Sequence, residues 1–185
     1  MLPIDKLKDT IPKSILDRGL TVLRTESRPM KLLFEQRRMP EEGWKDSQIE
    51  ELLNLLSAMD TDKDIKAARL GEREGRVASP AVSRLAYGFH QGVGRSGDLT
   101  EAQPKAAGGS LMYFLANKLS SDALARLGVP NIKGAVVLPL ATGMTLALAL
   151  CVARNLTKGK EVVYPQIDHK TPLKAIRLAG VGMAR

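Results

Sequence analysis

The 185-residue sequence contains a single cysteine, Cys151. One cysteine cannot form an internal disulfide or a cysteine-based metal cage, which fits a reducing compartment. Apolar runs long enough to cross a bilayer are also missing, because the longest, residues 135–153, is interrupted by Pro139, Thr142 and Gly143. The first residues lack the basic and apolar stretches that begin a secretion signal. We therefore expect a cytoplasmic protein.

Low-complexity tracts and internal repeats are absent as well. The hydrophobic content of 44% is ordinary and sufficient for a core. The formal net charge of +8 attracts polyanions such as nucleic acid. Because many soluble proteins are basic, the charge alone does not decide between a nucleic-acid binder and an ordinary basic protein.

The first part of the chain has helical patterns. Residues 1–40 contain short apolar groups punctuated by Pro12, Gly19 and Pro29, which predicts an interrupted amphipathic segment that needs a packing partner. Further helices are predicted to begin after residue 46 and at Ser79-Pro80, and to cover residues 111–119 and 122–127.

From residue 134 the pattern changes to an alternation of strand and helix. Apolar runs at 134–138 and 161–164 alternate with helical patterns at 145–156 and 170–179, and Val181 begins a further strand. This order is typical of a parallel α/β sheet. Two strands and the start of a third do not complete such a sheet, so the sequence predicts an N-terminal part of a longer protein.

Arginine and glycine recur on both sides of the helix that begins at Ser79. One group spans residues 71–76, another spans 92–98, and Gln103-Pro104-Lys105 follows. The side chains suited to phosphate there are Arg73, Arg76, Arg95, Ser96 and Gln103. The glycines also let backbone amides approach an anion. The pattern favours a site for a phosphorylated substrate, and the alternative is a basic surface loop.

The same segment matches the dinucleotide-binding fingerprint Gly92-x-Gly94-x-x-Gly97. That fingerprint needs a strand before it and a helix directly after it. Here a helix precedes the glycines and a loop follows, so we reject a dinucleotide site.

Two positions in the second half are candidates for ligand contacts. Residues 141–144 join a predicted strand to a helix, where free amides favour a phosphate, although a plain turn would look the same. Asp168 and His169 follow a predicted strand, at the sheet edge where ligands bind. A histidine there can contact a bound ring or simply precede a helix. His90 and Cys151 are interpreted as structural.

Several motifs together resemble the O-phosphoseryl-tRNA(Sec) selenium transferase family, the selenocysteine synthases of archaea and eukaryotes. They are Glu-Arg-Glu-Gly-Arg-Val-Ala-Ser at 72–79, Gly-Arg-Ser-Gly-Asp at 94–98, Gln-Pro-Lys-Ala-Ala-Gly at 103–108, and residues 141–144. The similarity runs from about residue 30 to about residue 183. It implies an α/β protein, with an N-terminal helical extension followed by the start of a pyridoxal-phosphate fold type I domain. The domains would span 1–45 (oligomerisation), 46–130 (helices and phosphate loop) and 131–185 (start of the cofactor domain).

The resemblance also implies an activity. The family converts O-phosphoseryl-tRNA(Sec) to selenocysteinyl-tRNA(Sec) with pyridoxal 5'-phosphate and selenophosphate, by elimination of phosphate and addition of selenium. The chain is therefore expected to be an RNA-binding transferase of protein biosynthesis and to assemble as a homotetramer.

Roles carry over to the matching positions. In the 94–104 loop, Arg95, Ser96 and Gln103 would hold the substrate phosphate. The cofactor-binding positions would be Arg73, Thr142, Gly143, Met144 and His169. Arg73 would reach the cofactor region of its own or of a neighbouring subunit, and glutamine also occurs in the family at the position of His169. No metal site is implied.

No lysine in the sequence matches the family's Schiff-base lysine, which the resemblance locates beyond residue 185. No catalytic residue is therefore assigned, and we expect no turnover by this chain alone. Two alternatives stay open. One is a non-catalytic fragment that binds tRNA or phosphate, and the other is the related enzyme that makes cysteinyl-tRNA from the same phosphoserine.

Overall fold

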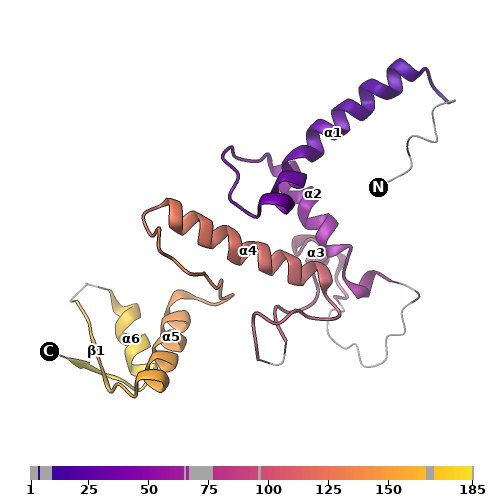
Figure 1. Cartoon of the computed structure of the whole chain (residues 1–185). Coiled ribbons are helices and arrows are strands. Elements are labelled where there is room, and N and C mark those ends of the chain that lie inside the picture. Colours follow the sequence, from indigo (N-terminus) through magenta and orange to yellow (C-terminus); the bar gives the residue numbers. More distant parts are fainter. Residues whose placement is uncertain are drawn as a thin grey trace. The chain divides into compact units, whose positions relative to one another are not determined.

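The computed structural model describes Ile4 and residues 10–64, 66, 77–95, 97–165 and 169–184. The chain divides into two units, Met1–Val137 and Leu138–Arg185 (Figure 1). The first unit contains α1 (Lys13–Gln36), α2 (Asp46–Ser57), the 3₁₀ helix η2 (Thr61–Lys63), α3 (Pro80–Leu85) and α4 (Ala107–Arg126). The second contains α5 (Thr142–Thr157), β1 (Glu161–Val163), α6 (Lys170–Leu178) and β2 (Gly182–Ala184). The predicted division by role at 1–45, 46–130 and 131–185 stays a prediction.

α1 is one continuous helix, although the sequence predicts an interrupted one. Pro29 lies inside it and removes a single backbone donor, while the remaining hydrogen bonds carry the helix to Gln36. The helix ends at Arg37, which adopts a left-handed conformation with φ of 53°. Leu33 is buried, whereas Ile15 is 58% exposed. The helix thus keeps an apolar surface that its own unit does not cover.

The core of the first unit is centred on the crossing of α2 and α4. Leu56, at the end of α2, is 1% exposed. A Cβ added to Gly108 would come within 1.6 Å of the Leu56 carbonyl oxygen, so only glycine allows this approach. Buried Asp60 accepts a hydrogen bond from the N–H of Gly109 at 3.0 Å. Its carboxylate therefore satisfies one of the amides that a helix leaves free at its start.

α4 replaces the two helices predicted at 111–119 and 122–127. The second of the two predicted helices begins at Asp122. In the structure Asp122 accepts from the Met39 N–H and from Arg126 Nε, both at 2.9 Å. Because the carboxylate is used by these partners, the helix runs through this point.

Residues 134–138 were predicted as a strand, and this prediction is wrong. The segment belongs to no strand or sheet of the described chain. The hydroxyl of Tyr113 donates to the Val137 carbonyl at 2.7 Å, and the Val137 N–H donates to Asn117 Oδ1 at 2.7 Å. Side chains of α4 therefore take the backbone groups that a neighbouring strand would have paired.

The second unit follows the predicted order of strands and helices. β1 and β2 pair in parallel, with Glu161 opposite Gly182 and Val163 opposite Ala184. α5 packs on α6 and buries Ala147 and Ile176. This arrangement is a truncated α/β domain, as the sequence predicts. None of the helices in the described parts of the chain has the length and apolar character to cross a membrane.

Replacing Gly108 with alanine is expected to destabilise the first unit by about 1–3 kcal/mol, because the backbones of α2 and α4 must separate. Gly19→Ala in α1 is the matched control, since nothing lies within 4 Å of the added Cβ. It is expected to stabilise by up to about 1 kcal/mol, the difference in helix propensity. Urea unfolding followed by the fluorescence of Trp44, the single tryptophan, measures both. Equal stability of Gly108→Ala and the unaltered chain would contradict the close approach.

Candidate functional site

The segment leading into the predicted phosphate loop begins with α3. Ser79 caps this helix by accepting from the Val82 N–H at 3.4 Å, as its sequence predicts. The helix ends at Leu85, and the chain then turns to His90. His90 Nδ1 lies 2.8 Å from Asp62 Oδ2, and its Nε2 lies 2.8 Å from Ser83 Oγ. These two contacts agree with a structural role for His90, which stays a prediction.

A tight hairpin carries Arg95. The N–H groups of Arg95 and Asp98 each donate to the other residue's carbonyl at 2.8 Å. Gly94 has φ of +74°, and a Cβ there would lie 2.4 Å from the Asp98 carbonyl oxygen. Gly97 has φ of +88°. Both glycines thus serve the hairpin turn, which agrees with the rejection of a dinucleotide site.

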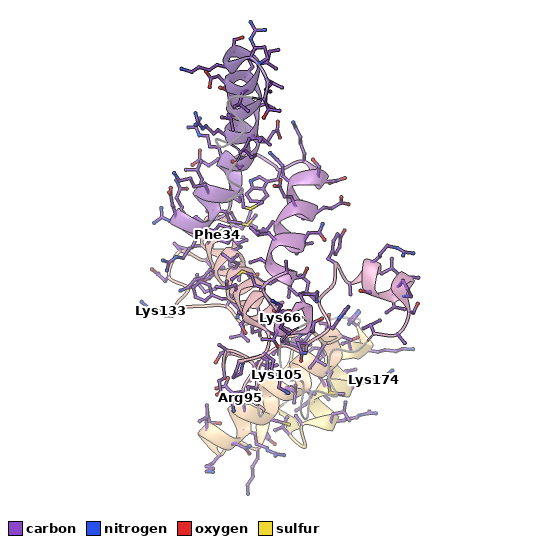
Figure 2. All side chains as sticks on the ribbon, turned by 90° about the vertical axis from the view of Figure 1, so that its right-hand side faces the viewer. Phe34, Lys66, Arg95, Lys105, Lys133 and Lys174 are labelled. Carbon is purple, nitrogen blue, oxygen red and sulfur yellow. The ribbon has the colours of Figure 1, made fainter. Side chains whose placement is uncertain are left out.

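Of the two described phosphate-binding candidates, Arg95 lies in this hairpin and Gln103 follows it. Arg95 is exposed, and its Nη1 lies 3.5 Å from Glu101 Oε1. Gln103 is half-buried, and its N–H donates to Ser110 Oγ at 2.9 Å. Figure 2 shows Arg95 and Lys105, which bound the same loop. Ser96 and Arg73, the other predicted donors of this region, lie outside the described residues.

The acidic residues of the loop, Asp98 and Glu101, were not among the predicted site residues. Glu101 partly neutralises Arg95, and both side chains are about half exposed, at 46% and 50%. The Thr100 hydroxyl and then the Thr100 N–H donate to Asp98 Oδ1, at 2.7 and 2.8 Å, and hold the pKa of Asp98 below its ordinary value. Asp98 and Glu101 follow Arg95 closely in the sequence, and this closeness of opposite charges was the signal that could have indicated the pairing. An incoming phosphate must compete with Glu101 for Arg95.

In the second unit, the predicted cofactor-phosphate turn forms the start of α5. The Ala141 carbonyl accepts from the N–H groups of Met144 and Thr145, both at 3.0 Å. The N–H groups of Thr142 and Gly143 precede the first residues that can bond within the helix. They lie at its positive end, which favours an anion.

His169 lies at the same end of this unit. It is exposed and immediately precedes α6, whose Thr171 methyl would be 3.1 Å from a Cβ on Gly143. At the opposite ends of the two helices, Arg154 Nη1 donates to the Ala179 carbonyl at 2.6 Å. α5 and α6 therefore run in the same direction, with both starts together. Asp168 lies outside the described residues.

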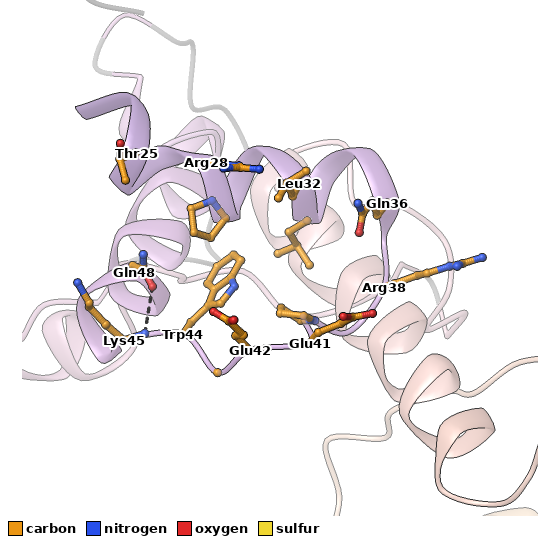
Figure 3. A pocket seen from close by; sticks show the side chains of 14 residues that line it. Thr25, Arg28, Leu32, Gln36, Arg38, Glu41, Glu42, Trp44, Lys45 and Gln48 are labelled. Atoms are coloured by element: carbon orange, nitrogen blue, oxygen red, sulfur yellow. Dashed lines mark hydrogen bonds between the residues drawn. The ribbon is translucent and has the colours of Figure 1, made fainter. Parts of the chain in front are cut away.

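A separate hollow of about 470 Å³ lies between α1 and the segment before α2. Figure 3 shows Arg28 and Leu32 of α1 across this hollow from Trp44, and the dashed line from the Lys45 N–H to Gln48 Oε1 at 3.0 Å. None of the predicted phosphate or cofactor residues that the structure describes lines it. The hollow is thus distinct from the candidate site.

Comparison with known proteins identifies the family. The family model described as O-phosphoseryl-tRNA(Sec) selenium transferase matches residues 59–184. The chain belongs to this family.

Relatives from several archaea and eukaryotes agree. The chain is 53% identical over 177 residues to the O-phosphoseryl-tRNA(Sec) selenium transferase of Methanopyrus kandleri, covering 96% of the chain and 40% of that relative. It is 38% identical over 182 residues to the protein of the same name in Dictyostelium discoideum, covering 96% of the chain and 38% of that relative.

The crystal structure of an archaeal O-phosphoseryl-tRNA(Sec) selenium transferase matches with a TM-score of 0.86 at 40% identity. This match covers 96% of the chain and 40% of the solved chain. The chain thus has the fold of its family over its own length and spans about 40% of the curated relatives.

Replacing Thr100 with valine is expected to raise the pKa of Asp98 toward its ordinary value of 3.8, because the strongest lowering contact is the Thr100 hydroxyl. Because the pKa of Asp98 is lowered, its contacts with Thr100 stabilise the loop fully above pH 3.8. This stabilisation is lost as the pH falls through the lowered pKa of Asp98. A carboxyl carbon NMR titration measures this pKa. Thr25→Val on α1 is the control, since its hydroxyl donates to Thr21. An unchanged pKa in Thr100→Val would refute the assignment.

Proposed function

We propose that this chain contributes to the conversion of O-phosphoseryl-tRNA(Sec) to selenocysteinyl-tRNA(Sec), with selenophosphate as selenium donor. Family membership and 53% identity to a named selenium transferase support the proposal. The observation that carries it is the exposed guanidinium of Arg95 on a glycine hairpin closed by two backbone hydrogen bonds. Such a group meets a phosphate without rearrangement of the backbone.

Arg95, Ser96 and Gln103 are proposed to hold the phosphate of the phosphoserine. A guanidinium presents paired donors that match two phosphate oxygens. A phosphate carries more charge than the Glu101 carboxylate, so it can displace Glu101 from Arg95. Gln103 is held through its backbone by Ser110, which leaves its side-chain amide to serve as a neutral donor.

The start of α5 fits the phosphate of pyridoxal 5'-phosphate. Thr142 and Gly143 offer free amides at a helix start, and Gly143 leaves the space that a side chain would fill against Thr171. Met144 and His169 border the same end of the unit, and Arg73 is proposed to reach the cofactor region. The cofactor, when bound, supplies the electron sink that loss of phosphate requires.

The lysine that binds the cofactor covalently is proposed not to be among these 185 residues. None of the lysines here matches the family's position. The chain by itself would then bind phosphate groups without turning over substrate. A non-catalytic role in binding tRNA or phosphate is the second candidate, and the exposed guanidinium of Arg95 is compatible with it.

Assembly and location are also proposals. The apolar surface of α1, with Ile15 at 58% and Val22 at 61% exposure, supports burial against other subunits of a homotetramer. A cytoplasmic enzyme that binds tRNA fits the biosynthetic role.

The relatives are named for selenium transfer, which supports the selenium enzyme over the one that makes cysteinyl-tRNA.

Arg95→Ala is expected to weaken binding of O-phosphoserine about tenfold or more, because a charge-assisted, two-pronged contact is lost. Arg126→Ala is the matched control, since Arg126 is also exposed and paired with a carboxylate, Asp122. NMR titration of the 185-residue chain measures both affinities. Equal affinities in the two variants would sink the proposed role of Arg95.

Pyridoxal 5'-phosphate is expected to shift the amide resonances of Thr142 and Gly143, and pyridoxal, which lacks the phosphate, is expected to leave them unchanged. After borohydride reduction, mass spectrometry is expected to find no single lysine fully modified. Equal shifts with both compounds would argue against a phosphate turn at α5. Full modification of one lysine would show that the binding lysine is present after all.

A further inference from the structure

The segment Asp60–Lys63, called here the 60–63 turn, contacts the chain on both sides of the loop that carries Arg95. On the entry side, Asp62 Oδ2 lies 2.8 Å from His90 Nδ1, and Lys63 Nζ donates to the Gly88 carbonyl at 2.7 Å. The side chains of Asp62 and His90 are only 12% and 13% exposed. This contact is therefore largely shielded from water.

On the exit side, the same turn holds the end of the loop. The N–H and the hydroxyl of Thr61 both donate to the Lys105 carbonyl, at 2.9 and 3.0 Å. Asp60 pairs with Ala106 as an isolated antiparallel bridge and accepts from Gly109 at the start of α4. Consecutive residues of one short turn thus fix both ends of residues 91–105.

We propose that Asp62 and His90 are positioning residues for Arg95. The inference rests on the proposed role of Arg95 in phosphate binding. By holding the entry of the loop, the Asp62–His90 contact keeps the hairpin where the guanidinium meets the phosphate. Fixing a binding group in advance lowers the ordering cost on binding, so affinity depends on residues that never touch the ligand.

The two nitrogens of His90 allow the two contacts to be separated. An asparagine amide reaches the position of Nδ1 and can keep the contact with Asp62, whereas a glutamine amide reaches the position of Nε2 and can keep the contact with Ser83. His90→Asn therefore preserves the connection to the 60–63 turn. His90→Gln preserves only a contact with α3, on the same side of the loop.

The test uses the 185-residue chain with His90→Asn, His90→Gln and Asp62→Ala. Asp122→Ala is the matched control, because Asp122 also joins two segments of the first unit, α4 and the chain at Met39, away from the loop. Hydrogen exchange is measured at the amides of Arg95, Asp98 and Gln103. Affinity for O-phosphoserine is measured by titration.

His90→Gln and Asp62→Ala are expected to speed exchange at these amides and to weaken binding about fivefold or more, while His90→Asn and Asp122→Ala stay within about twofold of the unaltered chain. The proposal would be overturned if His90→Asn weakened binding and sped exchange as much as His90→Gln. It would also be overturned if binding weakened without faster exchange. Failure of the unaltered chain to bind O-phosphoserine would refute the phosphate role alone. Exchange would then still decide whether the turn holds the loop.

Discussion

The close approach of α4 to the end of α2 is the constraint on which the first unit depends. It exists because Gly108 has no Cβ to meet the Leu56 carbonyl oxygen. Only at this separation can the Asp60 carboxylate reach the Gly109 N–H at the start of α4. Asp60 is also the first residue of the 60–63 turn, which holds both ends of the loop that carries Arg95. The position of that loop therefore depends on the close backbone contact at Gly108.

Local signals in the sequence predicted where several elements begin, but not that α1 and α4 are continuous. Ser79 followed by proline predicted the start of α3, and the alternation after residue 145 predicted α5, β1, α6 and β2. The predicted strand at 134–138 does not form, because a strand needs a pairing partner that its own sequence does not contain. The groups of Val137 instead bond to Tyr113 and Asn117, which no periodicity reveals.

The residue types in the sequence predicted the candidate site, but they did not predict how its charges are balanced. Arginine, glycine and glutamine in succession identified the loop, but the pairing of Arg95 with Glu101 depends on how the hairpin folds back. Similarly, the sequence could not show that Asp62 contacts His90 or that Thr61 holds Lys105, since these contacts join distant segments. The net charge of +8 therefore says little about the local field at Arg95.

The two proposed phosphate sites use different physical means. Arg95 carries a full charge on a flexible side chain and is balanced by Glu101, so it can exchange one anion for another. Thr142 and Gly143 offer backbone amides fixed by the helix itself, with a partial charge that does not move. A mobile, compensated cation suits a substrate phosphate that arrives and leaves, whereas fixed amides suit the phosphate of a resident cofactor. This difference in rigidity independently supports assigning the substrate to the first site and the cofactor to the second.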